Sequence, residues 1–202
     1  MKWVLAVLVA LAVLLVSRAA LCEDEGVLAP YGFGLAVGAG VTGFVEADMR
    51  EVTDPGGTWE VRVTAGTRLP IAFEAAYVGS AQAIDVLGLD PDAVLVGNGV
   101  EGGARLDVLP GELNPYFVAG LGWTRYELAN ADTNTSSVRR RDDILVLPFG
   151  VGLDMHVDWF VLDARAVMRL AFGNELMPDS AEPGNPTGLD SVSFLVRGGF
   201  EL

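Results

Sequence analysis

Residues 144–172 alternate between apolar residues and residues that are polar, charged or glycine. A period of two is typical of a β-strand whose two faces have different surroundings. A tight turn near Val157-Asp158 divides the segment into two arms of about a dozen residues, close to the ~9–11 that a tilted strand needs to cross a bilayer. One face of each arm is apolar, and the other carries glycines and charges. The pattern predicts a transmembrane hairpin with lipid on one side and a narrow ionic lumen on the other.

The position of the turn predicts which residues of the two arms pair. If the two arms pair around this turn, small residues lie opposite long charged ones and apolar residues lie opposite apolar ones. Gly152 then faces Asp163, Gly150 faces Arg165 and Leu153 faces Leu162. Such pairs stabilise a sheet, and the register also fixes the face that each side chain occupies.

Six further segments repeat this alternation, at 31–42, 59–66, 71–78, 96–108, 115–124 and 191–201. Together with the two arms they predict eight strands. The odd-numbered connections are long and the even-numbered ones short, as in barrels with short periplasmic turns and longer outer loops. The sequence therefore predicts an all-β fold, an eight-stranded antiparallel up-and-down transmembrane β-barrel. The alternative, a soluble lipocalin-like barrel, would have its apolar face inside.

Two polar positions fall on the predicted lipid face. Asn98 is the first, and we expect a bulge or a later start of the membrane span near Gly97 and Gly99. Arg125, just beyond the segment at 115–124, is the second. The membrane-buried part of that strand is therefore expected to end near Trp123.

The outward-facing aromatic residues gather near the strand ends, as expected at membrane interfaces. If the odd-numbered strands run outward, one belt lies at the periplasmic rim and another at the outer rim. The first belt contains Phe33, Phe73, Phe117, Phe160 and Phe200, and the second contains Trp59 and Phe172.

The N-terminus has the pattern of a secretory signal peptide. Lys2 precedes an unbroken apolar run at 3–16, and small residues precede Cys22. A membrane-spanning helix needs about 20 apolar residues, and Arg18 interrupts the run first. A retained anchor and a lipidated Cys22 are the alternatives. The expected organisation is a removed signal peptide at 1–22, a short periplasmic segment at 23–30 and the barrel at 31–202.

The composition excludes several classes of function. The formal net charge of −14 argues against nucleic acid as a partner. Cys22 is the only cysteine, which excludes an intramolecular disulfide and a multi-cysteine metal site. We expect no cofactor and no metal.

Two motifs suggest chemistry but have simpler explanations. Residues 38–43 and 97–102 match the dinucleotide fingerprint by letter, yet neither opens a helix, and close packing in a narrow barrel explains the glycines. Asp154 and His156 could form half of a hydrolase site. They lie beside the predicted periplasmic turn, so we interpret them as a structural or solvated pair.

Charged residues on the inward face form the most informative set. They number five arginines and seven acids, in a barrel whose interior is only wide enough for side chains. Buried charges must be paired or hydrated. The sequence therefore predicts a structural ion-pair network that fills the lumen, with a narrow ion-conducting path as the alternative. The set contains Glu60, Arg62, Glu74, Glu101, Arg105, Asp107, Asp154, Asp163, Arg165, Arg169, Arg197 and Glu201.

Residues 115–122, the glycine-alternating first strand and Phe200 near the C-terminus resemble the small OmpA-like and OmpX-like outer-membrane barrels. The resemblance implies a monomer in the outer membrane of a Gram-negative bacterium. Its partners would be outer-membrane lipid and lipopolysaccharide, and the outer-membrane assembly machinery during biogenesis. The implied role is non-catalytic, in envelope integrity or surface interaction. A porin-like channel and a lipid-modifying enzyme are the alternatives.

Overall fold

The structure is a computed structural model that describes residues 32–108, 113–131, 135–136, 138–157, 159–173, 176 and 188–202. The predicted signal peptide at 1–22 and the periplasmic segment at 23–30 lie outside the described residues. Gly32 precedes the first strand of the described chain.

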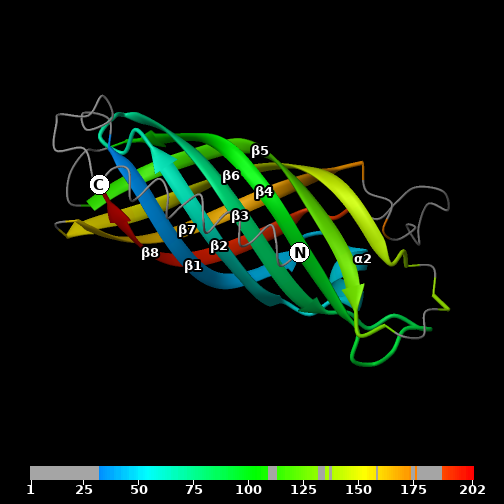
Figure 1. Cartoon of the computed structure of the whole chain (residues 1–202). Helices are drawn as coiled ribbons and strands as arrows, with labels where there is room; N and C mark the ends of the chain where they lie inside the picture. The colour runs from blue at the N-terminus through cyan, green and yellow to red at the C-terminus, as the bar shows by residue number, and fades with distance from the viewer. Residues whose placement is uncertain are drawn as a thin grey trace, which may run out of the picture.

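Eight strands form one closed barrel, in which each strand is antiparallel to both neighbours (Figure 1). The last strand pairs with the first, which leaves no free sheet edge. The predicted fold class is confirmed. The strands are β1 (Phe33–Phe44), β2 (Gly56–Ala65), β3 (Ile71–Ala83), β4 (Val94–Asp107), β5 (Leu113–Ala129), β6 (Arg141–Val157), β7 (Phe160–Phe172) and β8 (Ser191–Glu201).

The connections differ between the two ends of the barrel. The even-numbered connections are short and lie at one end with the C-terminus, here called the turn end (Figure 1). The other end, the loop end, carries the four long connections and a short helix, α2 (Ala47–Val52). The sequence predicts no helix at α2, because six residues are too few to show a helical period. No helix among the described residues has the length and apolar character needed to span a membrane.

The pairing of β6 with β7 differs from the predicted register. Val157 pairs with Phe160, so Gly152 lies opposite Arg165 and not opposite Asp163. The predicted pairing is wrong by two residues, because the ladder ends with Val157 opposite Phe160 and not at a turn near Val157-Asp158. A shift of two residues changes partners but keeps every side chain on its predicted face.

The bulge expected near Asn98 is absent from the described strand. The ladders from β4 to β3 and to β5 continue through this position without an extra residue. Asn98 lies half-buried on the outward face, where the Tyr77 hydroxyl donates a hydrogen bond of 2.6 Å to its Oδ1 atom. A polar partner on the neighbouring strand thus accommodates the amide without any change of register.

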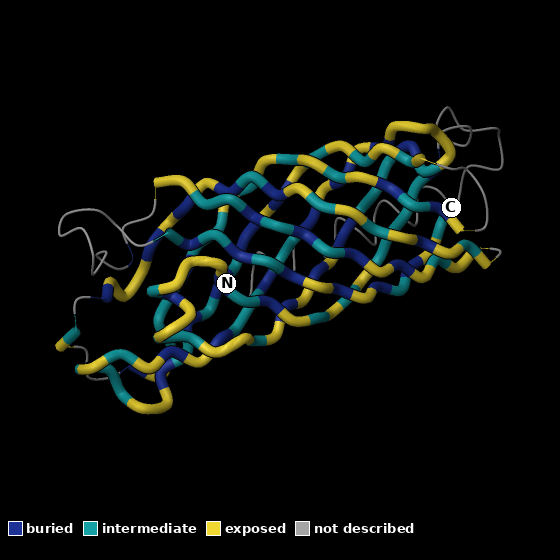
Figure 2. Tube along the Cα trace, turned by 180° about the vertical axis from the view of Figure 1, so that it is seen from behind, coloured by how far each residue is buried: buried dark blue, intermediate teal, exposed yellow. Residues whose placement is uncertain are grey.

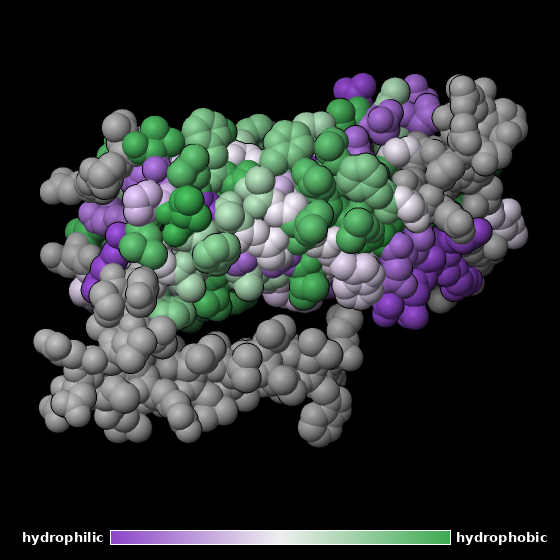
Figure 3. Space-filling model, turned by 90° about the horizontal axis from the view of Figure 1, so that it is seen from above, coloured by the Kyte–Doolittle hydropathy of each residue, from purple (hydrophilic) through white to green (hydrophobic). Residues whose placement is uncertain are grey.

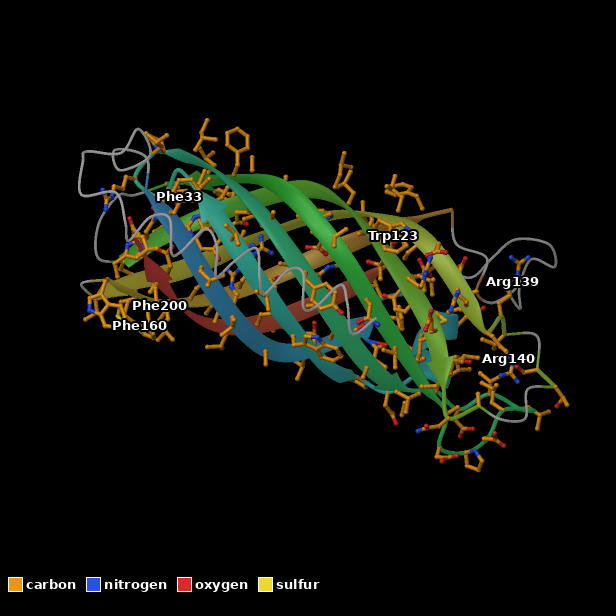
Figure 4. All side chains as sticks on the ribbon, viewed as in Figure 1. Phe33, Trp123, Arg139, Arg140, Phe160 and Phe200 are labelled. Carbon is orange, nitrogen blue, oxygen red and sulfur yellow. The ribbon has the colours of Figure 1, made fainter. Side chains whose placement is uncertain are left out.

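Burial alternates along the strands (Figure 2). The exposed positions are mostly apolar, and the buried ones are mostly polar or charged except toward the loop end. Figure 3 shows apolar side chains gathered over the face of the barrel wall in view. Phe33, Phe160 and Phe200 lie together at the turn end (Figure 4). The Phe200 ring stacks on Trp159 with 5.0 Å between centroids and meets Phe160 edge-on at 6.1 Å. Phe33, Phe160 and Phe200 are three of the five residues predicted for one aromatic belt.

Candidate functional site

The barrel lumen is the candidate site, and Tyr116 of β5 lies at its centre. Its side chain is 1% exposed, and its hydroxyl contacts three charged residues. Arg165 Nε and Arg197 Nη2 each donate to the hydroxyl oxygen at 2.8 Å, and the hydroxyl donates to Asp163 Oδ2. The ring lies beside Gly152, its partner in the β5–β6 ladder, where a Cβ atom would collide with it. Glycine at 152 therefore leaves the space that the ring occupies.

Two glutamates complete a central cluster around this tyrosine. Arg165 binds Glu74 through two hydrogen bonds of 2.8 and 2.9 Å, the fork geometry that suits a guanidinium and a carboxylate. Arg62 donates to Glu60 at 2.7 and 2.9 Å and also contacts Glu74. Three arginines and three acids balance within the central cluster: Arg62, Arg165 and Arg197 with Glu60, Glu74 and Asp163.

A second, smaller group lies on the loop-end side of the central cluster. Arg169 Nε donates to Glu101 Oε1 at 2.5 Å, and its Nη1 atom donates to Ser193 at 2.9 Å. Ser193 in turn donates to Thr42 at 2.8 Å. Ser193 and Thr42 are uncharged and are not members of the predicted lumen set. Arg169 has more N–H donors than the single carboxylate of Glu101 binds. The Ser193 hydroxyl accepts from one of the remaining donors and donates in turn to Thr42.

A third group lies near the turn end. Arg105 donates to Asp107 at 2.7 Å, also contacts Asp154, and stacks on the Tyr116 ring at 4.0 Å. Asn114 donates to the same oxygen of Asp107 at 2.7 Å. Glu201 accepts a hydrogen bond of 2.9 Å from Thr67. All twelve charged residues of the predicted lumen set thus lie in one of these three groups.

His156 and Asp154 do not form a hydrogen bond in the described structure. His156 Nε2 lies 3.9 Å from Asp154 and 3.7 Å from Glu201, and both distances exceed a hydrogen bond. Ser193 is a buried serine of the lumen, but it is engaged by Arg169 and Thr42 in the second group. The described residues also contain no group of three or more His, Cys, Asp or Glu side chains that could hold a metal.

Two glycines of the fingerprint-like segments leave space for residues of neighbouring strands. Residues 38–43 lie within β1 and residues 97–102 within β4, where the ladders bond the backbone to both neighbouring strands. A Cβ atom at Gly38 would collide with the side chain of Arg197, and one at Gly99 would approach Thr124. These glycines make room for inward-pointing side chains.

An apolar cluster fills the loop end of the lumen, and the sequence analysis did not predict it. Strand residues such as Leu95 and Ile144 point inward there, and each is 1% exposed. All four long connections add buried residues, including Met49 of α2 at 0%. The missed signal is that the inward positions of several strands become apolar toward the loop end. The cluster contains Phe44, Met49, Ile84, Ala93, Leu95, Tyr126, Ala131, Val138, Ile144, Val146, Leu176 and Leu189.

A small cavity lies in the described lumen between the first two charged groups. It measures about 20 Å³ and is lined by Arg62, Glu74 and Glu101 together with backbone near Gly120 and Pro148. The β5–β6 ladder is interrupted beside it, because Pro148 has no N–H to donate. A cavity of this size holds about one water molecule.

No protein-family model matches the chain, and no curated protein matches it. Several solved structures have a similar fold. Neisserial surface protein A, NspA, has a TM-score of 0.60 and 12% identity over 83% of this chain and 96% of its own. The attachment invasion locus protein Ail of Yersinia pestis, solved in complex with the heparin analogue sucrose octasulfate, has a TM-score of 0.55 and 10% identity over 85% and 98%.

The outer-membrane protein OprG from Pseudomonas aeruginosa has a TM-score of 0.50 and 13% identity over 85% of this chain and 95% of its own. These similar structures are small eight-stranded outer-membrane barrels, and the present chain has the same architecture. The predicted resemblance is confirmed at the level of fold. Identities this low carry no further conclusion.

Proposed function

We propose that the chain is a non-catalytic integral barrel of the bacterial outer membrane whose role is envelope integrity or surface interaction. The single observation that carries this proposal is the filled lumen. Charged groups occupy the lumen from the turn end to its middle, and the apolar cluster occupies the loop end. A barrel of this kind presents its outer wall to lipid and its loops to the surroundings, while its interior maintains the fold.

The loop end supports a role in surface interaction. Met49, Ile84, Val138 and Leu189 come from the four long connections and are buried in one apolar cluster. Backbone hydrogen bonds also join these connections, from Val45 N to the carbonyl of Asp190 at 2.8 Å and from Asp85 N to that of Val52 at 2.8 Å. Loops fixed in this way form a preordered surface, which lowers the entropic cost of binding a partner. NspA, a surface protein, and Ail, an attachment invasion locus protein, are similar barrels and support this direction.

A narrow ion path is the second candidate. The observation that favours it is the excess of acid over arginine near the turn end, where Arg105 faces Asp107 and Asp154. Such an excess attracts cations toward that end. The apolar cluster opposes conduction, because an ion crossing it would lose its hydration without gaining a polar partner.

The location is tested by expressing the full chain in a Gram-negative host and separating the inner and outer membranes. The account expects the protein in the outer membrane, with gel mobility that changes on heating. Recovery in the soluble or inner-membrane fraction contradicts it. Deleting the gene in its own host then separates the two roles: sensitivity to detergents indicates envelope integrity, and loss of adhesion with an intact permeability barrier indicates surface interaction.

A further inference from the structure

The cationic residues outside the lumen are unevenly placed. The sequence has 13 lysines and arginines and a net charge of −14, and five of the arginines lie in the lumen groups. Six more arginines lie in the described chain outside these groups, and four of these six belong to the loop end of the β5–β6 hairpin. These four, here called the basic ledge, are Arg125, Arg139, Arg140 and Arg141.

The ledge begins where the lipid-facing surface ends. Trp123 faces outward from β5 with 41% exposure, and Arg125 follows two residues later on the same face. The guanidinium of Arg125 lies over the Trp123 ring, 5.1 Å from its centroid. Tryptophan concentrates at the membrane–water interface, so the next outward position along the strand lies at the level of the lipid headgroups. Arg139 and Arg140 lie beyond Trp123 at the loop end (Figure 4).

The backbone that carries these arginines is fixed. Val138 is 4% exposed within the apolar cluster. Arg139 N donates to the Leu176 carbonyl at 2.9 Å, and Leu128 N donates to the Arg140 carbonyl at 3.0 Å. The arginine side chains therefore extend from an ordered platform, and only side-chain freedom is lost when an anion binds.

Exposed acids contact Arg125 and Arg141 of the ledge. Arg125 donates to Asp143 at 2.7 and 3.1 Å, and Arg141 contacts Glu127 at 2.8 Å. Solvent-exposed pairs of this kind contribute little, so the guanidinium groups can turn toward a stronger acceptor. The planar fork of arginine binds two phosphate oxygens at once.

We propose that the basic ledge binds the phosphate groups of lipid in the leaflet at the loop end of the barrel. The inference rests on the proposed membrane location. Lipid is the source because hydrocarbon chains beside Trp123 hold their phosphates at the depth of the ledge, whereas the acidity of the whole chain repels soluble polyanions. The ledge thereby fixes the depth and rotation of the barrel in its bilayer.

The test uses the full-length mature barrel in nanodiscs of phosphatidylcholine that contain a small fraction of fluorescent lipid A, or of the same lipid with its phosphates removed. Energy transfer is measured in a Trp59→Phe/Trp159→Phe background, so that Trp123 is the donor and reports enrichment of the labelled lipid near the ledge. The ledge variant is Arg139→Ala/Arg140→Ala, and the charge-matched control is Arg50→Ala/Arg68→Ala, which removes two exposed arginines elsewhere.

Wild-type protein is expected to enrich the phosphorylated lipid. The ledge variant should lose about fivefold in affinity per arginine, or roughly 30-fold for both, and the loss should shrink at high salt. The control variant should bind like wild type. Equal enrichment of both lipids, or equal loss in both variants, overturns the proposal. So does tight binding of soluble tripolyphosphate in detergent, which would assign the ledge to a soluble anion.

Heat-modifiable gel mobility is measured on the same nanodisc samples. A barrel that is folded and membrane-inserted but shows no lipid preference contradicts the ledge proposal alone. A barrel that does not insert contradicts the proposed function.

Discussion

Arg165 lies directly opposite Gly152 in the β6–β7 ladder. The room left by this glycine is filled by the Tyr116 ring from β5, and Arg165 donates to the Tyr116 hydroxyl at 2.8 Å while binding Glu74 through its other two nitrogens. One position without a side chain therefore allows the tyrosine to reach the arginine. The stability of the central cluster depends on this arrangement.

Gly152→Ala should destabilise the barrel although it adds a single methyl group. The new Cβ atom would collide with the Tyr116 ring and displace its hydroxyl from Arg165 and Asp163. Overpacking of this kind costs about 1–3 kcal/mol of unfolding free energy. Urea unfolding in lipid vesicles measures the change. Gly43→Ala on β1 is the matched control, because nothing lies within 4 Å of its added Cβ; an equal loss in both variants would argue against the packing explanation.

Arg165→Ala should cost much more than the loss of an exposed arginine. Its removal leaves Glu74 without its two-bond partner inside the lumen, and breaking a buried pair costs about 3–5 kcal/mol. Arg140→Ala at the loop end should change stability little, since its side chain is exposed. The same vesicle titration compares the two. Similar unfolding midpoints would mean that Arg62 and water in the lumen compensate Glu74 for the lost arginine.

Leu153→Arg should impair insertion into vesicles. Leu153 faces outward at mid-strand with 42% exposure, and an arginine on the lipid face near the midplane costs about 2–4 kcal/mol. Leu87→Arg is the control, because Leu87 lies in the β3–β4 connection and is 97% exposed. Folding yield in vesicles, read from heat-modifiable mobility, should fall only for Leu153→Arg. A normal yield for that variant would show that the face assignment is wrong.

Met49→Ala should loosen the loop end and leave the barrel wall intact. Met49 is fully buried in the apolar cluster, and truncating a buried methionine costs about 2–5 kcal/mol of local packing. Hydrogen exchange should therefore increase in α2 and the long connections, while the strands remain protected. Leu87→Ala should leave exchange unchanged. Protection that is identical in Met49→Ala and wild type would show that the apolar cluster does not hold the loops.

The sequence predicts the strands, their faces and the inward charges because all three depend on a period of two. It misplaces the β6–β7 partners by two residues, because the faces are unchanged by such a shift and nothing local distinguishes a turn near Val157-Asp158 from a ladder that ends with Val157 opposite Phe160. Tyr116 and Met49 illustrate the remaining limit. The role of Tyr116 depends on its contacts with Gly152 and Arg165, and that of Met49 on its contacts with the other long connections. These partners are distant in the sequence, so no local pattern encodes the contacts.

The central claim is that the lumen is closed by its own side chains. Single-channel recording on the wild-type barrel in a planar bilayer tests it most directly, on protein whose folding is first verified by heat-modifiable mobility. The account predicts a flat current across the voltage range, because ion pairs fill the middle of the lumen and the apolar cluster fills the loop end. Stable, reproducible conductance steps from that protein would contradict it and would assign the lumen to ion passage.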